Sequence, residues 1–226
     1  MTVPAPDPRA VRAASQEELR RLRLPPPPPQ FPLVWDQGDR VALRATPDLE
    51  ARTAVLNVVL ARCYGMPQEA AMSWLLGARL VEALTPPECQ FVIGDKGDRR
   101  AFALHLEAIH GLTWLLGMAD RLDPLEPAPE RLVDQLPDLR KAESMQRWRS
   151  RTLVAPRDAA EAAAMLDLYY CLDWAFLEAE RHRMRLPGVV DSHAIGQRRW
   201  ALEWGVTLTG PYHDPARRWE EIDLST

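Results

Sequence analysis

Hydrophobic residues recur at helical spacing along most of this chain, and the longest such stretch is Asp158–Arg185. Between Ala162 and Leu177 only Asp167 and Asp173 carry a charge. A helix that is apolar on nearly all sides is usually buried. The pattern therefore predicts a central buried helix in an all-α fold.

Further helices are predicted wherever a start signal precedes an apolar run of helical period. The clearest start is Thr85-Pro86-Pro87-Glu88, a capping box with prolines in the first helical turn. The longer helices are expected at residues 46–64, 67–84, 85–93, 99–121, 158–185 and 192–207. Shorter ones in the N-terminal arm and before Leu136 bring the expected total to about eight.

Residues 1–30 are rich in proline and include the unbroken run Pro25–Pro29. Consecutive prolines favour an extended polyproline II segment. We therefore divide the chain into a Pro-rich N-terminal arm or linker at 1–30 and a single globular helical domain at 31–226. The sequence leaves open whether the arm is disordered or packs along the domain.

Alternation of apolar and polar residues, which is typical of strands, is confined to Phe31–Arg44. Apolar residues alternate on both sides of the turn sequence Asp36–Asp39. A small β-hairpin near the N-terminus is therefore expected.

The composition limits the classes of partner. Of the 226 residues 46% are hydrophobic, enough for a sizeable core, and a net charge of -4 gives no general attraction to nucleic acid. The basic run Arg147–Arg151, with Arg140 and Lys141 upstream, is expected to be a solvated loop. The uncharged helical run Ala108–Ala119 is far too short to span a bilayer. We expect neither nucleic acid nor a membrane as a partner.

Cysteine usage is typical of a reducing compartment. Cys63, Cys89 and Cys171 lie far apart and form no Cys-x-x-Cys pair, so neither a zinc knuckle nor a disulfide framework is predicted. The N-terminal residues lack the apolar core of a secretory signal. A cytoplasmic protein is therefore expected.

One residue pair has the spacing of a metal site. Glu107 and His110 share a helix face at i and i+3, which is half of the ligand set of a ferritin-like di-metal centre. A second Glu-x-x-His is missing, and the nearest analogue, Glu178 with His182, has the wrong spacing. We therefore expect no metal and no cofactor, and keep Glu107 and His110 as weak candidates.

Asp167 and Asp173 are the most informative polar positions, because a carboxylate among apolar neighbours is costly to ionise without a partner. Their expected partners are Arg198 or Arg199 on the last helix. In the alternative, Asp167, Tyr170 and Trp174 share a helix face at i, i+3 and i+7 and line a polar pocket.

Several short sequence matches, in the right order, resemble the mainly bacterial helical family known as domain of unknown function 4272. They fall between Arg52 and Thr226 and comprise Trp74-Leu75, Thr85–Glu88, Trp114–Gly117, Arg157, Glu161, Asp167–Tyr170, Trp174-Ala175, Arg198, Ala201-Leu202, Trp204 and Trp219. The resemblance implies a single helical domain and supplies no activity, cofactor or catalytic residue. The chain has Asp173, Gln197 and Glu203 where that family tends to have His, Glu and Asn.

These observations favour a non-enzymatic intracellular binding or interaction module. No Gly-x-Ser-x-Gly, Walker, Rossmann or His-Glu-x-x-His motif occurs. The alternative is an enzyme or small-ligand-binding protein with a polar pocket between the central and last helices. Such a module would bind another protein, whose identity the sequence does not specify, and the oligomeric state is equally open. The candidates for the pocket or for an ion-pair network are Arg157, Glu161, Asp167, Tyr170, Asp173, Trp174, Arg198 and Trp204.

Overall fold

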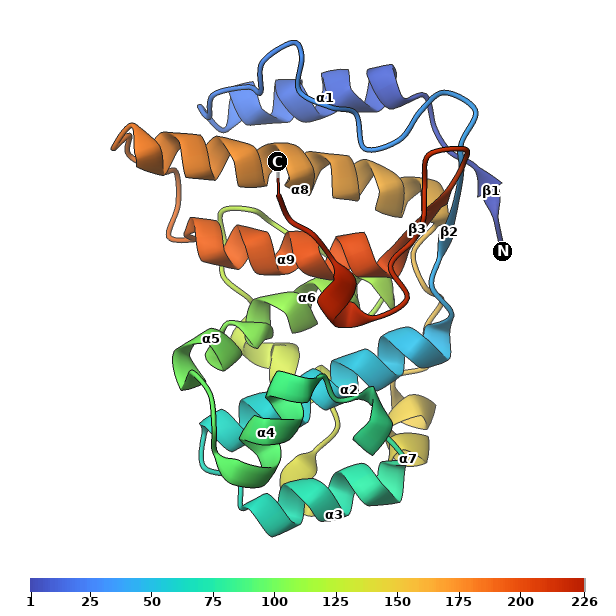
Figure 1. The fold of residues 1–226 in the computed structure, drawn as a ribbon, viewed down its shortest axis with the longest axis vertical. Coiled ribbons are helices and arrows are strands. Elements are labelled where there is room, and N and C mark those ends of the chain that lie inside the picture. The colour runs from blue at the N-terminus through green and yellow to red at the C-terminus, as the bar shows by residue number, and fades with distance from the viewer. Residues whose placement is uncertain (226) are drawn as a thin grey trace.

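The computed structural model describes residues 1–225, and most of them are helical (Figure 1). The mostly helical single domain predicted from the sequence is confirmed. Nine α-helices lie in this described part: α1 (Pro8–Arg21), α2 (Thr46–Cys63), α3 (Gln68–Ala78), α4 (Pro86–Gly94), α5 (Arg99–Ala103), α6 (His105–Leu115), α7 (Met145–Arg151), α8 (Ala159–Arg181) and α9 (Ser192–Gly205). The strands are β1 (Val3–Pro4), β2 (Arg40–Leu43) and β3 (Val206–Thr209). Short 3-10 turns form at Val81–Ala83, Glu130–Gln135, Leu139–Lys141 and Trp219–Glu221.

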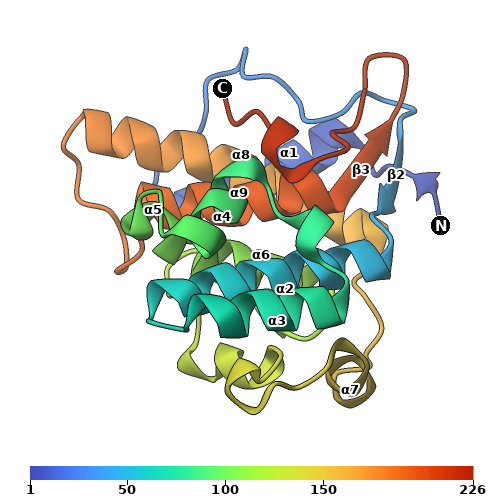
Figure 2. The ribbon, with the colours of Figure 1, turned by 60° about the horizontal axis from the view of Figure 1, so that its bottom comes forward.

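The helices lie in a stack that runs from α1 through α8, α9, α6 and α2 to α3 (Figure 1). The central helix α8 therefore packs between α1 and α9, as expected for its apolar sequence. Its start is fixed by Asp158, whose side chain accepts hydrogen bonds from the backbone N–H groups of Ala160 and Glu161. Figure 2 shows α2 and α3 side by side, with α7 below them in that view.

Two hydrophobic clusters stabilise the stack, and α2 contributes to both. Leu49 and Leu56 join the larger cluster, which α1, α6, α8 and α9 build. Val55 and Val58 join the smaller one with residues of α3, α4 and α7. Apolar residues on both faces of α2 follow from this position between two cores.

The predicted hairpin at Phe31–Arg44 is wrong in its pairing. Only Arg40–Leu43 form a strand, and β2 lies between β1 and β3 in an antiparallel sheet. The register pairs Val41 with Val3 on one side and with Leu208 on the other. The alternation of apolar and polar residues indicates a half-buried strand but does not indicate its partner. The pairing of β2 with β1 and β3, which lie far away in the chain, could therefore not be predicted from it.

Three further elements differ from the expectation. The helix predicted at 67–84 ends at Ala78, because Arg79 adopts a left-handed backbone conformation, and only a 3-10 turn follows at Val81–Ala83. The helix predicted at 99–121 is divided at Leu104, whose N–H bonds to the carbonyl of Ala101, and it ends at Leu115 before Gly117, which has a φ of 77°. The basic stretch Arg147–Arg151 is not a loop but part of α7, which Ser144 caps. Its Trp148 is fully buried in the smaller core.

The proline-rich arm packs along the central helix. Helix α1 lies against α8 (Figure 1), and Leu19, Leu22 and Leu24 enter the larger core. After the prolines, Trp35 is buried and donates its indole N–H to the carbonyl of Pro6. The arm is thus held at both ends of the proline run.

Candidate functional site

Asp167 of α8 forms a buried ion pair with the arm. Its carboxylate lies 2.8 Å from Nη2 of Arg12 and accepts a hydrogen bond of 2.7 Å from the hydroxyl of Ser15. The sequence suggested Arg198 or Arg199 as the partner of Asp167, and this is wrong. A partner 155 residues away in the chain cannot be recognised from local spacing.

Asp173 does pair with the last helix, as predicted. Its Oδ2 lies 2.6 Å from Nη1 of Arg199, and Nε of the same arginine lies 3.3 Å from Glu203. Burial raises the pKa of the Asp173 carboxyl, and the hydrogen bond from Arg199 opposes that shift. The pair joins α8 to α9.

Arg198 is fully buried and binds Glu107, the residue considered for a metal. The guanidinium lies 2.7 Å from Oε2 of Glu107 and donates to the hydroxyl of Tyr169 at 3.2 Å. Burial raises the pKa of Tyr169 to about 12, so this hydroxyl stays protonated at neutral pH. Glu107 therefore works as an anchor between α6 and α9.

His110, the other metal candidate, forms a hydrogen bond of 3.1 Å between its Nε2 and the carbonyl of Arg121. Burial lowers its pKa to about 4, so the ring is neutral at pH 7 and Nε2 carries the donated proton. Within residues 1–225 no three His, Cys, Asp or Glu side chains lie close enough together to hold a metal ion.

The face of α8 suggested as a pocket wall is covered by Arg12 of the arm, whose guanidinium lies 5.7 Å from the Tyr170 ring, and by Phe31, which follows the arm. The ring of Phe31 stacks on Tyr170 with a centroid distance of 4.6 Å and lies 5.9 Å from that of Trp174. The guanidinium of Arg199 lies 4.6 Å from the Tyr170 ring. Side chains of the protein itself thus occupy the space that a ligand would need on this face.

Arg157 and Glu161 lie at the start of α8, away from the ion pairs of α9. Their closest charged atoms are 3.8 Å apart, and Arg157 donates to the carbonyls of Trp114 and Ala119. This arginine ties the segment before α8 to the end of α6. Together, the predicted residues form separate contacts between segments of the chain and do not gather in one site.

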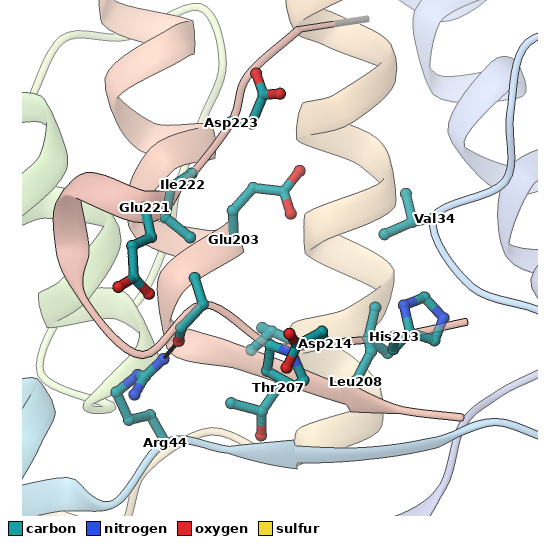
Figure 3. Close-up of a pocket in the computed structure, with 13 residues that line it drawn as sticks. Val34, Arg44, Glu203, Thr207, Leu208, His213, Asp214, Glu221, Ile222 and Asp223 are labelled. Carbon is teal, nitrogen blue, oxygen red and sulfur yellow. Dashed lines mark hydrogen bonds between the residues drawn. The ribbon is translucent and has the colours of Figure 1, made fainter. Parts of the chain in front are cut away.

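A cleft lined by polar and charged groups lies where the C-terminal segment returns across α9. We call residues 213–225 the strap. The cleft has a volume of about 230 Å³ and lies between α9, the outer edge of β3 and the strap (Figure 3). Its charged and titratable lining residues are Arg44, Glu203, His213, Asp214, Glu221 and Asp223.

The carboxylates of the cleft outnumber its cations. Arg44 already donates to the carbonyls of Trp204 and Ala216, at 2.9 and 2.6 Å, and its guanidinium lies 4.4 Å from the Trp204 ring. His213 lies 2.8 Å from Asp39. Figure 3 shows Glu203 and Asp223 at the opposite side of the cleft from Arg44. The cleft is therefore locally negative at the Glu203 side.

Glu203 is the electrostatically exceptional residue of the cleft. Burial raises the pKa of its carboxyl, and nearby Asp173 raises it further, while Arg199 opposes the shift. Arg199 is shared, because it also pairs with Asp173 at the shorter distance. The charge on Glu203 is therefore only partly compensated within the described residues.

Sequence reasoning missed the residues of this cleft. Arg44, Glu203 and His213 come from three segments, and none belongs to a motif. The one available signal was Glu203, because it departs from the family pattern. Trp204, a predicted site residue, lies beside the cleft as the surface on which Arg44 packs.

Comparison with known protein families gave a match that covers nearly the whole chain. A family model described as a domain of unknown function (DUF4272) matches residues 11–222. The chain belongs to this family. The match begins within α1, so it includes most of the arm as well as the helices that follow. Neither the curated proteins nor the solved structures with which the chain was compared gave a match.

No helix in the described residues is both long enough and apolar enough to cross a membrane.

Proposed function

We propose that this protein is a non-enzymatic cytoplasmic binding module whose cleft holds an ammonium or guanidinium group. The observation that carries the proposal is the partly compensated carboxylate of Glu203 in a negative cleft of about 230 Å³. A cationic group beside Glu203 would lower the cost of a half-buried charge that Arg199 compensates only in part.

The size of the cleft limits what enters it. Pockets for drug-sized ligands have volumes of about 300–1,000 Å³, and this one is smaller at about 230 Å³. It suits the end of a ligand, such as an alkylamine, or one lysine or arginine side chain of a protein partner. Both sources share the same chemistry.

The candidate acid and base residues support a binding role. Asp167, Asp173 and Glu107 each accept a hydrogen bond from a buried arginine, so none of these carboxylates is free to take a proton from a substrate. The three cysteines are all free thiols, which fits the reducing cytoplasm.

A titration monitored by tryptophan fluorescence tests the proposal. Butylamine and butylguanidinium are added to the full chain, with butanoate and butanol as anionic and neutral controls, and an extended lysine-containing peptide is compared with the free amine. The cations should bind and the controls should not. In Glu203→Gln the affinity should fall roughly tenfold or more, because a hydrogen bond to a charged group contributes about 1.5–3 kcal/mol.

Glu220→Gln is the matched control, because this strap residue is exposed and does not line the cleft. Equal binding of butylamine and butanoate, or an affinity unchanged in Glu203→Gln, would rule out the cation site. Preference for the peptide over the free amine would identify a protein partner as the source of the cation.

A further inference from the structure

The strap is held by the buried side chain of Trp219, by hydrogen bonds to its backbone, and at its start by the contact of His213 with Asp39. Of residues 213–225 only Trp219 is buried. The side chains of Arg44, Trp200 and Arg199 donate hydrogen bonds to the strap carbonyls of Ala216, Trp219 and Leu224, at 2.6, 3.0 and 3.1 Å. Because these donors bind main-chain carbonyls, their hydrogen bonds do not depend on the side chains of the segment that they hold.

The site of Trp219 is built from aromatic rings and a guanidinium. The Trp219 ring stacks on Trp200 with a centroid distance of 5.8 Å and meets Trp204 edge-on at 5.5 Å. The guanidinium of Arg52 lies 4.5 Å from its centre, and that arginine is fixed by a buried ion pair with Glu88. A rigid aromatic anchor in such a site is typical of the residues that dominate binding energy in protein interfaces.

The strap leaves two polar groups of this site unsatisfied. Nε of Arg52 and Nε1 of Trp204 are buried donors without a hydrogen-bond partner in the described part of the chain. Arg52 is 97% buried, being 3% exposed, and both side chains contact the Trp219 ring. Buried donors without an acceptor are costly, so the strap is an imperfect occupant of this site.

We propose that the surface formed by Arg44, Arg52, Arg199, Trp200 and Trp204 is a peptide-binding surface that the strap occupies in cis. Its partner is an extended segment of another protein that carries a tryptophan. The strap supplies the template, because its one buried side chain is Trp219 and its other contacts with these residues are main-chain carbonyls that accept hydrogen bonds from side chains. A partner that brings an acceptor to Arg52 or Trp204 would replace the strap.

The surface shares Arg44 with the cation cleft, and the strap borders both. The cleft exists only while the strap is in place, since the strap residues from His213 to Asp223 form one of its walls. A segment bound in trans would open that wall. The two proposals can therefore fail separately: one needs Glu203, and the other needs the site of Trp219.

Binding of a labelled peptide with the sequence of residues 213–225 tests the inference by fluorescence anisotropy. Full-length Trp219→Ala, in which the strap has lost its anchor, should bind the peptide. The wild type should bind it at least roughly tenfold more weakly, because its own strap competes at a millimolar effective concentration. A peptide with alanine in place of the tryptophan should bind neither protein.

The matched control is Trp74→Ala, which removes a buried tryptophan from the smaller core and leaves the strap in place. It should gain no peptide binding. If folded Trp219→Ala binds no peptide, or if all variants bind it equally, the inference is wrong. Circular dichroism establishes that each variant is folded.

A nicked chain gives an independent answer should Trp219→Ala fail to fold. A protease site inserted beside Tyr212, which is 85% exposed, allows the strap to be cut in the folded protein. The labelled peptide should then displace the cut strap. If the cut strap dissociates and the labelled peptide does not bind in its place, the inference is wrong.

Discussion

Buried arginines are the residues on which this molecule depends most. Four of them pair with buried or half-buried carboxylates, and each pair joins segments far apart in the chain: Arg12 with Asp167, Arg52 with Glu88, Arg198 with Glu107, and Arg199 with Asp173. The planar guanidinium suits this role because it also donates to nearby carbonyls, as Arg198 does to Asp123 and Glu126. Each arginine thus works as a crosslink between helices.

Asp167→Ala should lower the free energy of unfolding by about 3–5 kcal/mol, because it leaves Arg12 buried without a counter-charge. Urea denaturation followed by circular dichroism measures the change. The matched variant Glu161→Ala removes a partly exposed carboxylate 3.8 Å from Arg157 and should cost less than about 1 kcal/mol. A loss below about 1 kcal/mol for Asp167→Ala would mean that this ion pair contributes little to the fold.

Among the elements, α6 and α9 make the closest helix contact. A Cβ atom at Gly111 of α6 would lie 2.8 Å from Cβ of Ala201 and 3.3 Å from the carbonyl oxygen of Arg198. Only glycine therefore allows the two helices to approach this closely. The same contact brings Glu107 within reach of Arg198.

Gly111→Ala should destabilise the fold by about 1–3 kcal/mol, because α6 must move away from α9. Gly77→Ala is the control, since a Cβ atom at this position of α3 meets nothing within 4 Å. It should be neutral or stabilise by up to about 1 kcal/mol, through the better helix propensity of alanine. Thermal melting distinguishes the two variants, and equal effects would contradict this packing argument.

Elements with local signals were predictable from the sequence. The capping box of Thr85 and Glu88 forms as predicted, and α8 begins at its predicted cap, Asp158. Elements that depend on distant partners were not. The sheet needs residues 3–4, 40–43 and 206–209 to meet, and a hairpin pattern cannot contain that information.

Of the candidate site, only the ion pair that joins α8 to α9 was predictable from the sequence. The pairing of Asp173 with an arginine of the last helix followed from the cost of a buried charge, although the choice between Arg198 and Arg199 did not. The cleft did not follow, because it depends on the path of the strap after Gly210. An aromatic side chain alone does not reveal that path, since Tyr212 is 85% exposed whereas Trp219 is the one buried residue among 213–225.

For the molecule as a whole, the buried His110 and the half-buried His105 predict sensitivity to acid. Burial lowers the pKa of both His105 and His110 from 6.5 to about 4. Between these values the unfolded chain binds protons that the folded chain does not, so stability decreases as the pH falls from 6.5 toward 4. Each histidine contributes a loss on the order of 3 kcal/mol across that range.

Replacing both histidines with glutamine should flatten the pH dependence of the unfolding free energy between pH 6.5 and 4. Urea denaturation at several pH values measures the slope. The exposed His182 provides the control, because its replacement by glutamine should leave the slope as in the wild type. A double variant with the wild-type slope would show that the acid sensitivity arises elsewhere.

The most direct measurement of the proposed binding role is the pKa of Glu203, followed by NMR of its side-chain carboxyl with and without butylguanidinium. In the free protein the pKa should lie above the ordinary glutamate value, because the carboxyl is half-buried and Arg199 is shared with Asp173. The bound cation should lower that pKa, since it stabilises the charged form. A pKa that butylguanidinium leaves unchanged would contradict the proposal that this cleft binds cations.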